Sequence, residues 1–463
     1  MLKSLSRIYF GILTAFLPFV SGLFAQPCSL DSTFDAGLNP GAVIYIVTVQ
    51  TNGQILIGGS FESVGGVRIT NVARLNTNGT LDTSFSPGAA ANRGYVNAIA
   101  VQPDGKIVLG GAFYSSIGIA PANLARLNAN GSVDQNFDNN LLVDDAVNSI
   151  VIQPDGLILF GGAFAVVNEL QRRSVARLNA DGTLDITFDA CVASTAGVGA
   201  TWLGLQSDGR IIATGIFAFA NGEYRYGLAR LGLCGDVDLS YAPQQPGIDF
   251  DTTAYTFVMR HDERVVLAGS FSTYNGVFSR GVARVTTNGL PDSSFSPGDG
   301  INAGGTTYAL AMQHDGKLVI AGDFTGYDQQ TRYRIARINA DGALDTGCDA
   351  GGGPDAAVSS LAIQRDGKIL VAGRFSTFNG LPRVGLARLN GDHRLAEAQR
   401  LADGRFQMNF YGDNGVSYSL ESSSNLVDWI SISNFTATTS PKPLIDSSAA
   451  SNPKQFYRAV YTP

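Results

Sequence analysis

Seven aspartates and seven arginines recur at fixed places in the chain, and they are the first candidates for chemistry. Each Asp stands in a segment similar to "LDxxF", and each Arg stands in a segment similar to "ARLN". Paired carboxylates can perform acid–base catalysis, but seven identical acids do not single out one active site. An Asp and an Arg that recur together instead indicate one structural ion pair per repeat. These residues are Asp31, Asp82, Asp134, Asp185, Asp238, Asp292 and Asp345, with Arg74, Arg126, Arg177, Arg230, Arg284, Arg337 and Arg388.

A second group of candidates lies in loops that differ from one repeat to the next. Function on repeat folds is commonly carried by such loops. Their arginine and aromatic side chains predict that these loops form one face around the central channel of the repeat array, where a glycan or a protein would bind. The recurrence of Arg fits a structural role equally well. The predicted ligand-binding residues are Arg68, Arg172, Arg225, Tyr224, Arg280, Phe278, Arg332, Tyr333 and Arg383.

Residues typical of catalysis are few. The three histidines all fall in hairpin turns, and neither a G-x-S-x-G nor an H-E-x-x-H motif occurs. The turn "NADGTLD" at 179–185 spaces oxygen atoms somewhat as a calcium loop does, but it has no closing Glu, which favours a plain hairpin. We therefore predict a non-enzymatic binding scaffold with no catalytic residue, no metal and no cofactor.

The alternative is a polysaccharide hydrolase or lyase that uses paired Asp residues at the channel mouth. Its candidate acids are Asp144, Asp145, Asp249, Asp251 and Asp299.

The elements that would position these residues form a repeat. A Phe that closes segments such as "KIVLGGAF" recurs seven times at intervals of 51 to 54 residues, in register with "ARLN". Each copy contains four short segments with strand character separated by turns, as in "YVNAIAVQ", "KIVLGGAF", "NLARLN" and "SVDQNF". Radially repeated four-stranded sheets make a β-propeller, and small residues such as Ala98 and Ala100 suit its crowded axis.

The ends of the array predict how the ring closes. No "LDxxF" segment follows the seventh "ARLN", but an unpaired copy, "LDSTF" at 30–34, precedes the first repeat. An N-terminal strand that completes blade seven would remove the exposed edges of an open array. The predicted fold is therefore all-β: a seven-bladed β-propeller of four-stranded blades over residues 26–395, closed by the N-terminal strand and followed by a small β-sandwich over 396–463.

The cysteines and the N-terminus indicate an exported protein. Residues 1–25 resemble a signal peptide, with Lys3 and Arg7 before an apolar run and a small-residue cleavage site. We expect disulfides between Cys191 and Cys234 and between Cys28 and Cys348, with four buried free thiols as the alternative. Localisation would be secreted, periplasmic or cell-surface, with no membrane span after signal cleavage.

The net charge and the repeat pattern limit the classes of partner that we expect. The net charge of -7 argues against nucleic acid. We expect a monomer whose partner is an extracellular glycan or protein.

Two parts of the chain resemble known families. "QPDGKIVLGGAF", "ARLN" and "DGTLDxxF" resemble the bacterial delta-60 repeat β-propellers, which implies the fold and supplies no general catalytic motif. "YSLESSSNLVDW" and "FYRAVY" resemble the fibronectin-like or immunoglobulin-like terminal modules of secreted bacterial proteins. In that module Trp429 is expected to anchor the core.

Overall fold

The structure is a computed structural model, and every named element in its described part is a β-strand. The residues described are 27–88, 91, 93–113, 123–137, 141–190, 192–193, 199–220, 222–241, 247–249, 252–313, 315–391, 394–411, 417–424, 428–438, 442–448 and 456–461. The predicted signal peptide lies outside them. A search of the described residues finds no helix with the length and apolarity needed to span a membrane.

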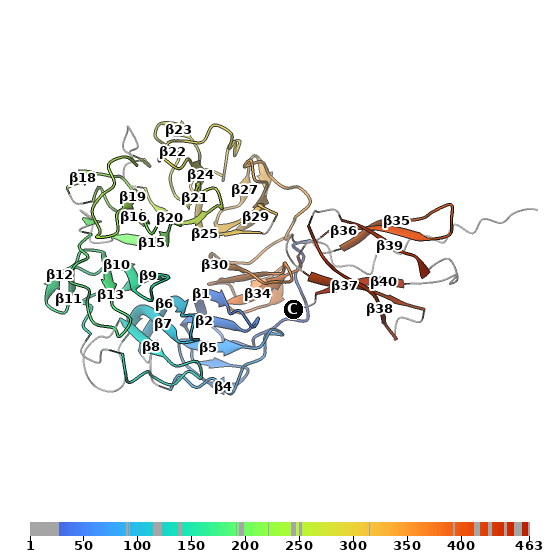
Figure 1. Cartoon of the computed structure of the whole chain (residues 1–463), viewed down its shortest axis with the longest axis horizontal. Coiled ribbons are helices and arrows are strands. Elements are labelled where there is room, and N and C mark those ends of the chain that lie inside the picture. The colour runs from blue at the N-terminus through green and yellow to red at the C-terminus, as the bar shows by residue number, and fades with distance from the viewer. Residues whose placement is uncertain are drawn as a thin grey trace, which may run out of the picture.

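Seven three-stranded antiparallel sheets, one per repeat, lie in a ring (Figure 1). In each, the second strand of the repeat lies between the first and the third. In chain order the sheets are β1 (Val43–Val49), β2 (Ile55–Ser60) and β5 (Val72–Leu75); β6 (Gly94–Val101), β7 (Ile107–Phe113) and β8 (Leu124–Leu127); β9 (Val147–Ile152), β10 (Ile158–Gly162) and β13 (Val175–Leu178); β15 (Ala200–Leu205), β16 (Ile211–Gly215) and β19 (Leu228–Leu231); β20 (Ala254–Met259), β21 (Val265–Gly269) and β24 (Val282–Val285); β25 (Thr306–Met312), β26 (Leu318–Asp323) and β29 (Ile335–Ile338); β30 (Val358–Ile363), β31 (Ile369–Gly373) and β34 (Leu386–Leu389).

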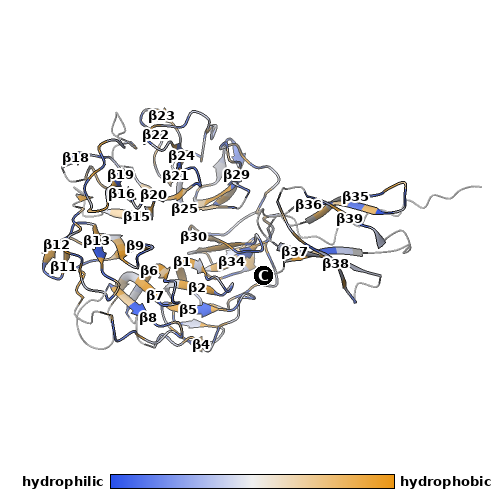
Figure 2. Cartoon of the chain, viewed as in Figure 1, coloured by the Kyte–Doolittle hydropathy of each residue, from blue (hydrophilic) through white to orange (hydrophobic). Residues whose placement is uncertain are grey.

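Burial explains the composition of these strands. The middle strands are buried on both faces, as the run of five buried residues in β10 and again in β21 shows, because each sheet is packed between its neighbours. First strands such as β9 alternate buried and half-buried residues at their start. The first strands lie toward the middle of the ring, and strands such as β9 and β15 are largely hydrophobic (Figures 1 and 2).

In the described residues, a short hairpin of two two-residue strands lies between the second and third strands of repeats one and three to seven. Strands β4, β12, β18 and β23 of these hairpins lie at the outer edge of the ring (Figure 1). The hairpins pair β3 (Ser63–Val64) with β4 (Val67–Arg68), β11 (Val166–Val167) with β12 (Leu170–Gln171), β17 (Phe219–Ala220) with β18 (Glu223–Tyr224), β22 (Thr273–Tyr274) with β23 (Val277–Phe278), β27 (Gly326–Tyr327) with β28 (Gln330–Thr331), and β32 (Thr377–Phe378) with β33 (Leu381–Pro382). Strand β14 (Val192–Ala193) also pairs with β17.

The expected fourth strand is reduced to a single bridge in each repeat. In repeat one, for example, Leu81 bridges Leu75, and the chain then turns away. The turn follows from the Asp: the Oδ1 atom of Asp82 accepts hydrogen bonds from the backbone N–H and the hydroxyl of Ser84 at 2.9 and 2.7 Å. Such an Asx turn curls the chain and prevents a longer ladder.

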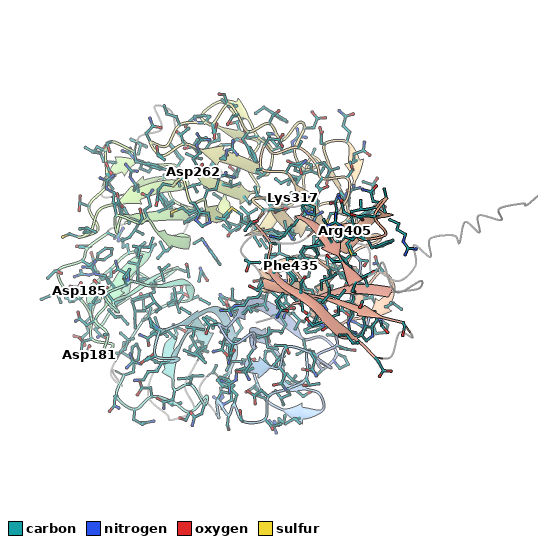
Figure 3. All side chains as sticks on the ribbon, turned by 45° about the vertical axis from the view of Figure 1, so that its right-hand side comes forward. Asp181, Asp185, Asp262, Lys317, Arg405 and Phe435 are labelled. Carbon is teal, nitrogen blue, oxygen red and sulfur yellow. A yellow bond between two sulfur atoms is a disulfide. The ribbon has the colours of Figure 1, made fainter. Side chains whose placement is uncertain are left out.

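The recurring Asp and Arg form the predicted ion pair in all seven repeats. In repeat two, Nε of Arg126 lies 2.8 Å from Oδ2 of Asp134, and its guanidinium stacks on Phe137 at 4.5 Å. A second guanidinium nitrogen donates to the Ala180 carbonyl in the next repeat. Arg74, Arg177, Arg230, Arg284 and Arg388 make the equivalent bond to a carbonyl of the following repeat, so these arginines tie together a strand, its Asp turn and the next repeat. Asp185 lies well away from the centre of the ring (Figure 3).

The two ends of the repeat array meet as the unpaired "LDSTF" segment predicts. Leu30 bridges Leu389, and Asp31 pairs with Arg388 of repeat seven at 2.9 Å. Arg388 also donates to the Thr77 carbonyl of repeat one at 2.6 Å. One core cluster contains residues from both ends of the array, among them Phe34, Ile44, Leu370 and Leu386.

The predicted disulfide between Cys28 and Cys348 is present. Cys348 occupies the place of the Phe or Tyr that stacks on Arg in the other repeats, so repeat six has a covalent link to the N-terminal segment there. The second predicted disulfide is not formed by Cys234, which is an exposed free thiol, and Cys191 lies outside the described residues.

This difference predicts a specific labelling pattern. In the native protein Cys234 should react with iodoacetamide within minutes, because its thiol is exposed. Peptide mapping without reductant should recover the Cys28–Cys348 linked peptide and a carbamidomethylated Cys234. Recovery of a peptide linked through Cys234 would contradict the structure.

The C-terminal residues form two three-stranded sheets beside the ring (Figure 1). One contains β35 (Arg394–Arg400), β36 (Phe406–Tyr411) and β39 (Lys442–Asp446), and the other contains β38 (Ile430–Thr436), β37 (Ser417–Ser423) and β40 (Phe456–Tyr461). The fully buried Phe410, Tyr418 and Leu420 form the core with the half-buried Phe435 (Figure 3). The expectation that Trp429 anchors this core was wrong, because Trp429 is only half-buried and its ring is covered by the Arg458 guanidinium at 4.2 Å.

Candidate functional site

A β-bulge interrupts the first strand of all seven repeats at the same position. In repeat two, Val96 and Ala98 pair with two consecutive residues of β7, so the residue between them has no partner in β7. The cause is the Gly that ends each "GG", "AG" or "TG" pair of the second strands: a Cβ atom on Gly111 would lie 2.1 Å from the Tyr95 carbonyl oxygen. Only Gly allows the first strand to approach that closely, and bulges are frequent beside active sites. The positions skipped are Tyr45, Asn97, Asn148, Thr201, Tyr255, Tyr308 and Ser359.

The first strands of all seven repeats line a cavity of about 240 Å³, and four of the seven bulge residues are among its lining. Tyr45, Asn148, Tyr308 and Ser359 line it from the bulge positions. The next residue of each strand is mostly small, as expected near the axis, and Ala98 lines the cavity as predicted. Trp202 is the exception, since it presents an indole where the other repeats have Ile, Ala, Ser or Thr.

We call the skipped residues together with Tyr95 the collar. Its aromatic members meet in pairs, with ring centroids 5.4 Å apart for Tyr45 and Tyr95 and 5.1 Å apart for Tyr255 and Tyr308. Nδ2 of Asn97 donates to Oδ1 of Asn148 at 3.0 Å. These described collar side chains are half-buried, so each keeps one side toward solvent.

The electrostatics of the collar suit neutral hydrogen bonding, with one Arg at its edge and one Asp at the equivalent position of the preceding repeat. Burial raises the pKa of Tyr255, and the adjacent Tyr308 raises it further, so the phenol keeps its proton at neutral pH. The exposed Arg374 of repeat seven lies over the Tyr45 ring of repeat one, at 5.7 Å. Equivalent positions hold Ser, Ala or Ile in repeats one to five and the exposed Asp323 in repeat six. Phenols, amides and hydroxyls around a concave site can orient a polar ligand while the rings contact its apolar faces.

The predicted ligand-binding residues occupy three different positions around the outer hairpins and not the central channel. Arg172, Arg225, Arg332 and Arg383 share one position, and their side chains are mostly buried. Arg383, for example, donates to the Ser32 carbonyl at 3.0 Å and lies 3.6 Å from Asp35. These four arginines hold the hairpins in place, which is the structural alternative considered above.

The other predicted residues are more accessible. Tyr224, Phe278 and Tyr333 are 64, 46 and 41% exposed, and Arg68 is exposed as well. Arg280 is half-buried and stacks on Phe278 at 5.0 Å. They are distributed around the outer edge of the ring, so the hairpins do not gather them into one site.

The aspartates considered for catalysis are engaged with backbone groups. Asp144 accepts hydrogen bonds from the N–H groups of Ala165 and Val166 at 2.9 and 3.0 Å. Asp249 accepts in the same way at the start of the next-but-one hairpin. These two acids position hairpins.

The remaining acids also have local partners. Asp145 accepts from the N–H of Ala146, and Asp299 accepts from Nε2 of Gln329. Asp251 lies outside the described residues. In the turn once compared with a calcium loop, Oδ1 of Asp181 accepts from the N–H and hydroxyl of Thr183, as a hairpin turn requires.

The repeated Asp residues predict loss of stability in acid. Burial raises the pKa of Asp82, but hydrogen bonds from Ser84 and Arg74 outweigh it and lower the pKa to about 2, and Asp292 behaves alike. Because the folded pKa lies below the unfolded value, this stabilisation is complete above about pH 4 and is lost as the pH falls toward 2. Urea unfolding at several pH values should give a flat free energy between about pH 5 and 7 and a steep decline below 4. An Asp82→Asn variant should decline less steeply; an unchanged slope would contradict this role.

The collar was missed at the sequence level because its residue types differ among repeats. Two signals were present. The Gly at the end of each second strand recurs in all seven copies, and one position of each first strand carries Tyr, Asn, Thr or Ser between smaller or apolar residues. Their meaning depends on the bulge, which only the paired strands show.

Comparisons with known proteins bear on the repeat. No curated protein matches the chain. A solved structure titled "Glycoside hydrolase" is 13% identical, with TM-score 0.24, and the match covers 95% of this chain and 98% of that one. Another, titled "Crystal structure of the eukaryotic initiation factor", is 11% identical, with TM-score 0.28, covering 93% and 92%.

A family profile matches all seven repeats. The matched residues are 50–85, 102–137, 153–188, 206–241, 262–295, 313–347 and 364–392, which together make up more than half of the chain. Each window begins just after a first strand and ends at the Phe or Tyr after the recurring Asp, except the sixth, which ends at Gly347, and the last, which ends just after the seventh "ARLN". The chain therefore belongs to the family described as "Domain of unknown function (DUF5122) beta-propeller".

Proposed function

We propose that the chain is an exported, non-enzymatic seven-bladed β-propeller that binds a glycan at the collar. In this proposal the seven sheets are blades, and residues 27–34 complete the seventh blade. The Leu30–Leu389 bridge, the Asp31–Arg388 pair and the Cys28–Cys348 disulfide support closure. The disulfide also supports an oxidising, extracytoplasmic location.

The observation that carries the proposal is that bulge residues from four repeats, Tyr45, Asn148, Tyr308 and Ser359, line one cavity. Tyr95, Asn97 and Tyr255 lie directly against Tyr45, Asn148 and Tyr308, respectively. A saccharide has apolar C–H faces and many hydroxyls, so it needs both aromatic surface and neutral donors and acceptors. The collar supplies these without a cluster of charges.

A binding role is favoured over hydrolysis because Asp144 and Asp249 each use a carboxylate to hold backbone N–H groups. The two C-terminal sheets would form the fibronectin-like sandwich and serve as a spacer or an attachment module.

The test is a saccharide binding screen on residues 26–463. Calorimetric titration against cello-, chito-, xylo- and uronate-containing oligosaccharides should reveal at least one binder with no new reducing ends. Saccharide consumption would support the hydrolase instead. Absence of binding across millimolar concentrations of all four classes would contradict the glycan proposal.

A further inference from the structure

A groove on the outer side of repeat one differs from the same place in repeats three, six and seven. It has a volume of about 650 Å³ and lies between the β3–β4 hairpin and the segment after Asp82. Ile69, Leu81 and Phe85 form its apolar floor, and Arg68 and Arg93 stand at its rim. The volume is in the usual range for ligand sites. This groove is separate from the collar.

Other repeats fill the equivalent place with a pair of their own residues. In repeat three, Arg172 donates to the Ile186 carbonyl at 3.3 Å and lies 3.8 Å from Asp189. Repeat six uses Arg332 with Asp349 at 4.0 Å, and repeat seven uses Arg383 with Asp35 at 3.6 Å. In all three the arginine side chain is only 10 to 12% exposed.

Repeat one lacks both members of that pair. Ile69 stands at the Arg position and Ser86 at the Asp position, so the groove stays open. Repeat five also lacks both, with Ser279 and Ser296, but there Arg280 is engaged on Phe278. Because both residues are absent, the space that the Arg–Asp pair fills in repeats three, six and seven is open in repeat one.

The rim of the groove carries positive charge without a counter-charge. Arg68 and Arg93 are both exposed, and no acidic side chain of the described residues forms an ion pair with either. The chain as a whole is acidic, with a net charge of -7. Two unpaired guanidinium groups above an apolar floor favour a ligand that has carboxylates next to an apolar side chain.

We propose that this groove binds an acidic, apolar peptide segment of a partner protein. The apolar side chain of the segment contacts Ile69 and Leu81, and its carboxylates pair with Arg68 and Arg93. The segment thus supplies the carboxylate that Asp189, Asp349 and Asp35 supply inside the chain.

The test closes the groove with the Arg–Asp pair that other repeats of the chain contain. The probe is a capped, dye-labelled peptide that alternates glutamate and leucine, measured by fluorescence anisotropy with residues 26–463, beside glutamine–leucine and lysine–leucine analogues. The double variant Ile69→Arg, Ser86→Asp installs the pair found in repeats three, six and seven. The matched control, Ser279→Arg with Ser296→Asp, installs it in repeat five.

We expect saturable binding of the glutamate peptide that is at least tenfold tighter than binding of the glutamine analogue and weakens with salt. Binding should be lost in the repeat-one variant and kept in the repeat-five control, with both variants as heat-stable as the parent. Replacing Arg68 and Arg93 by Gln should weaken binding at least tenfold. No binding, equal binding of the glutamine analogue, or binding that survives in the repeat-one variant would overturn the proposal. Sulfated dextran binding that is lost in the same variant, without peptide binding, would assign the groove to an anionic glycan and also overturn it.

Discussion

Replacing Cys28 and Cys348 together by Ser lowers the free energy of unfolding by about 4 kcal/mol, the usual size for a native disulfide. The bond links residues 320 apart in sequence, so it removes a large loop-closure entropy from the unfolded chain. It also joins repeat six to the segment that pairs with repeat seven. With the usual entropy of unfolding per residue, the melting midpoint falls by about 4 °C.

The control for this prediction is the third described cysteine. Cys234 is exposed and forms no disulfide, so Cys234→Ser should change the free energy of unfolding by less than about 0.5 kcal/mol. Hydrogen exchange locates the effect: the backbone amides of Cys28 and Asp31, which donate to Asn390 and Arg388 at 2.8 Å, should exchange faster in the double variant. Equal melting of the double variant and the control would mean that the two ends do not need this bond.

Replacing Tyr255 and Tyr308 together by Ala weakens saccharide binding about a hundredfold, the effect of removing a hot spot of at least 2 kcal/mol. Tyr308 lines the cavity, the Tyr255 ring lies 5.1 Å from the Tyr308 ring, and both residues are half-buried, so the double variant removes the aromatic surface expected to contact the ligand. Tyr308→Phe keeps the ring and removes only the phenol, and it should weaken binding less. Calorimetric titration with the best saccharide from the screen measures all three proteins.

Tyr224→Ala serves as the matched control for that experiment. Tyr224 is also an accessible tyrosine, 64% exposed, but it lies on a hairpin at the outer edge of the ring (Figure 1). Its removal should leave the affinity unchanged. If Tyr224→Ala weakens binding and the collar variant does not, the ligand binds the hairpin face predicted first.

The sequence was sufficient for features that depend on recurrence. The spacing of Phe and "ARLN" predicted the repeat, and the paired recurrence of Asp and Arg predicted the ion pairs. The unpaired "LDSTF" predicted that the two ends of the repeat array meet, as Leu30 and Leu389 do. These features repeat a local pattern, so each copy supports the others.

Features that depend on packing could not be read from the sequence. The collar needs the bulge that Gly111 and its equivalents allow, and a bulge is a property of two strands in contact. Arginines at neighbouring positions of the aligned repeats could not be told apart in the sequence, yet Arg172 is buried in an internal pair while Arg68, one position earlier, is exposed. The fourth strand was predicted too long because the Asx turn at Asp82 ends the ladder.

Tryptophan fluorescence tests the central claim most directly. The chain has two Trp residues, and Trp202 lines the cavity while Trp429 lies in the C-terminal sheets. In a Trp429→Phe variant all tryptophan emission therefore reports on the cavity. If the collar binds a glycan, the saccharide found by titration should shift that emission with the same midpoint as the heat signal, and the Tyr255→Ala, Tyr308→Ala variant should abolish the shift. The opposite result would contradict binding at this site: the heat of saccharide titration saturates, Trp202 emission does not change, and the collar variant binds as the parent does.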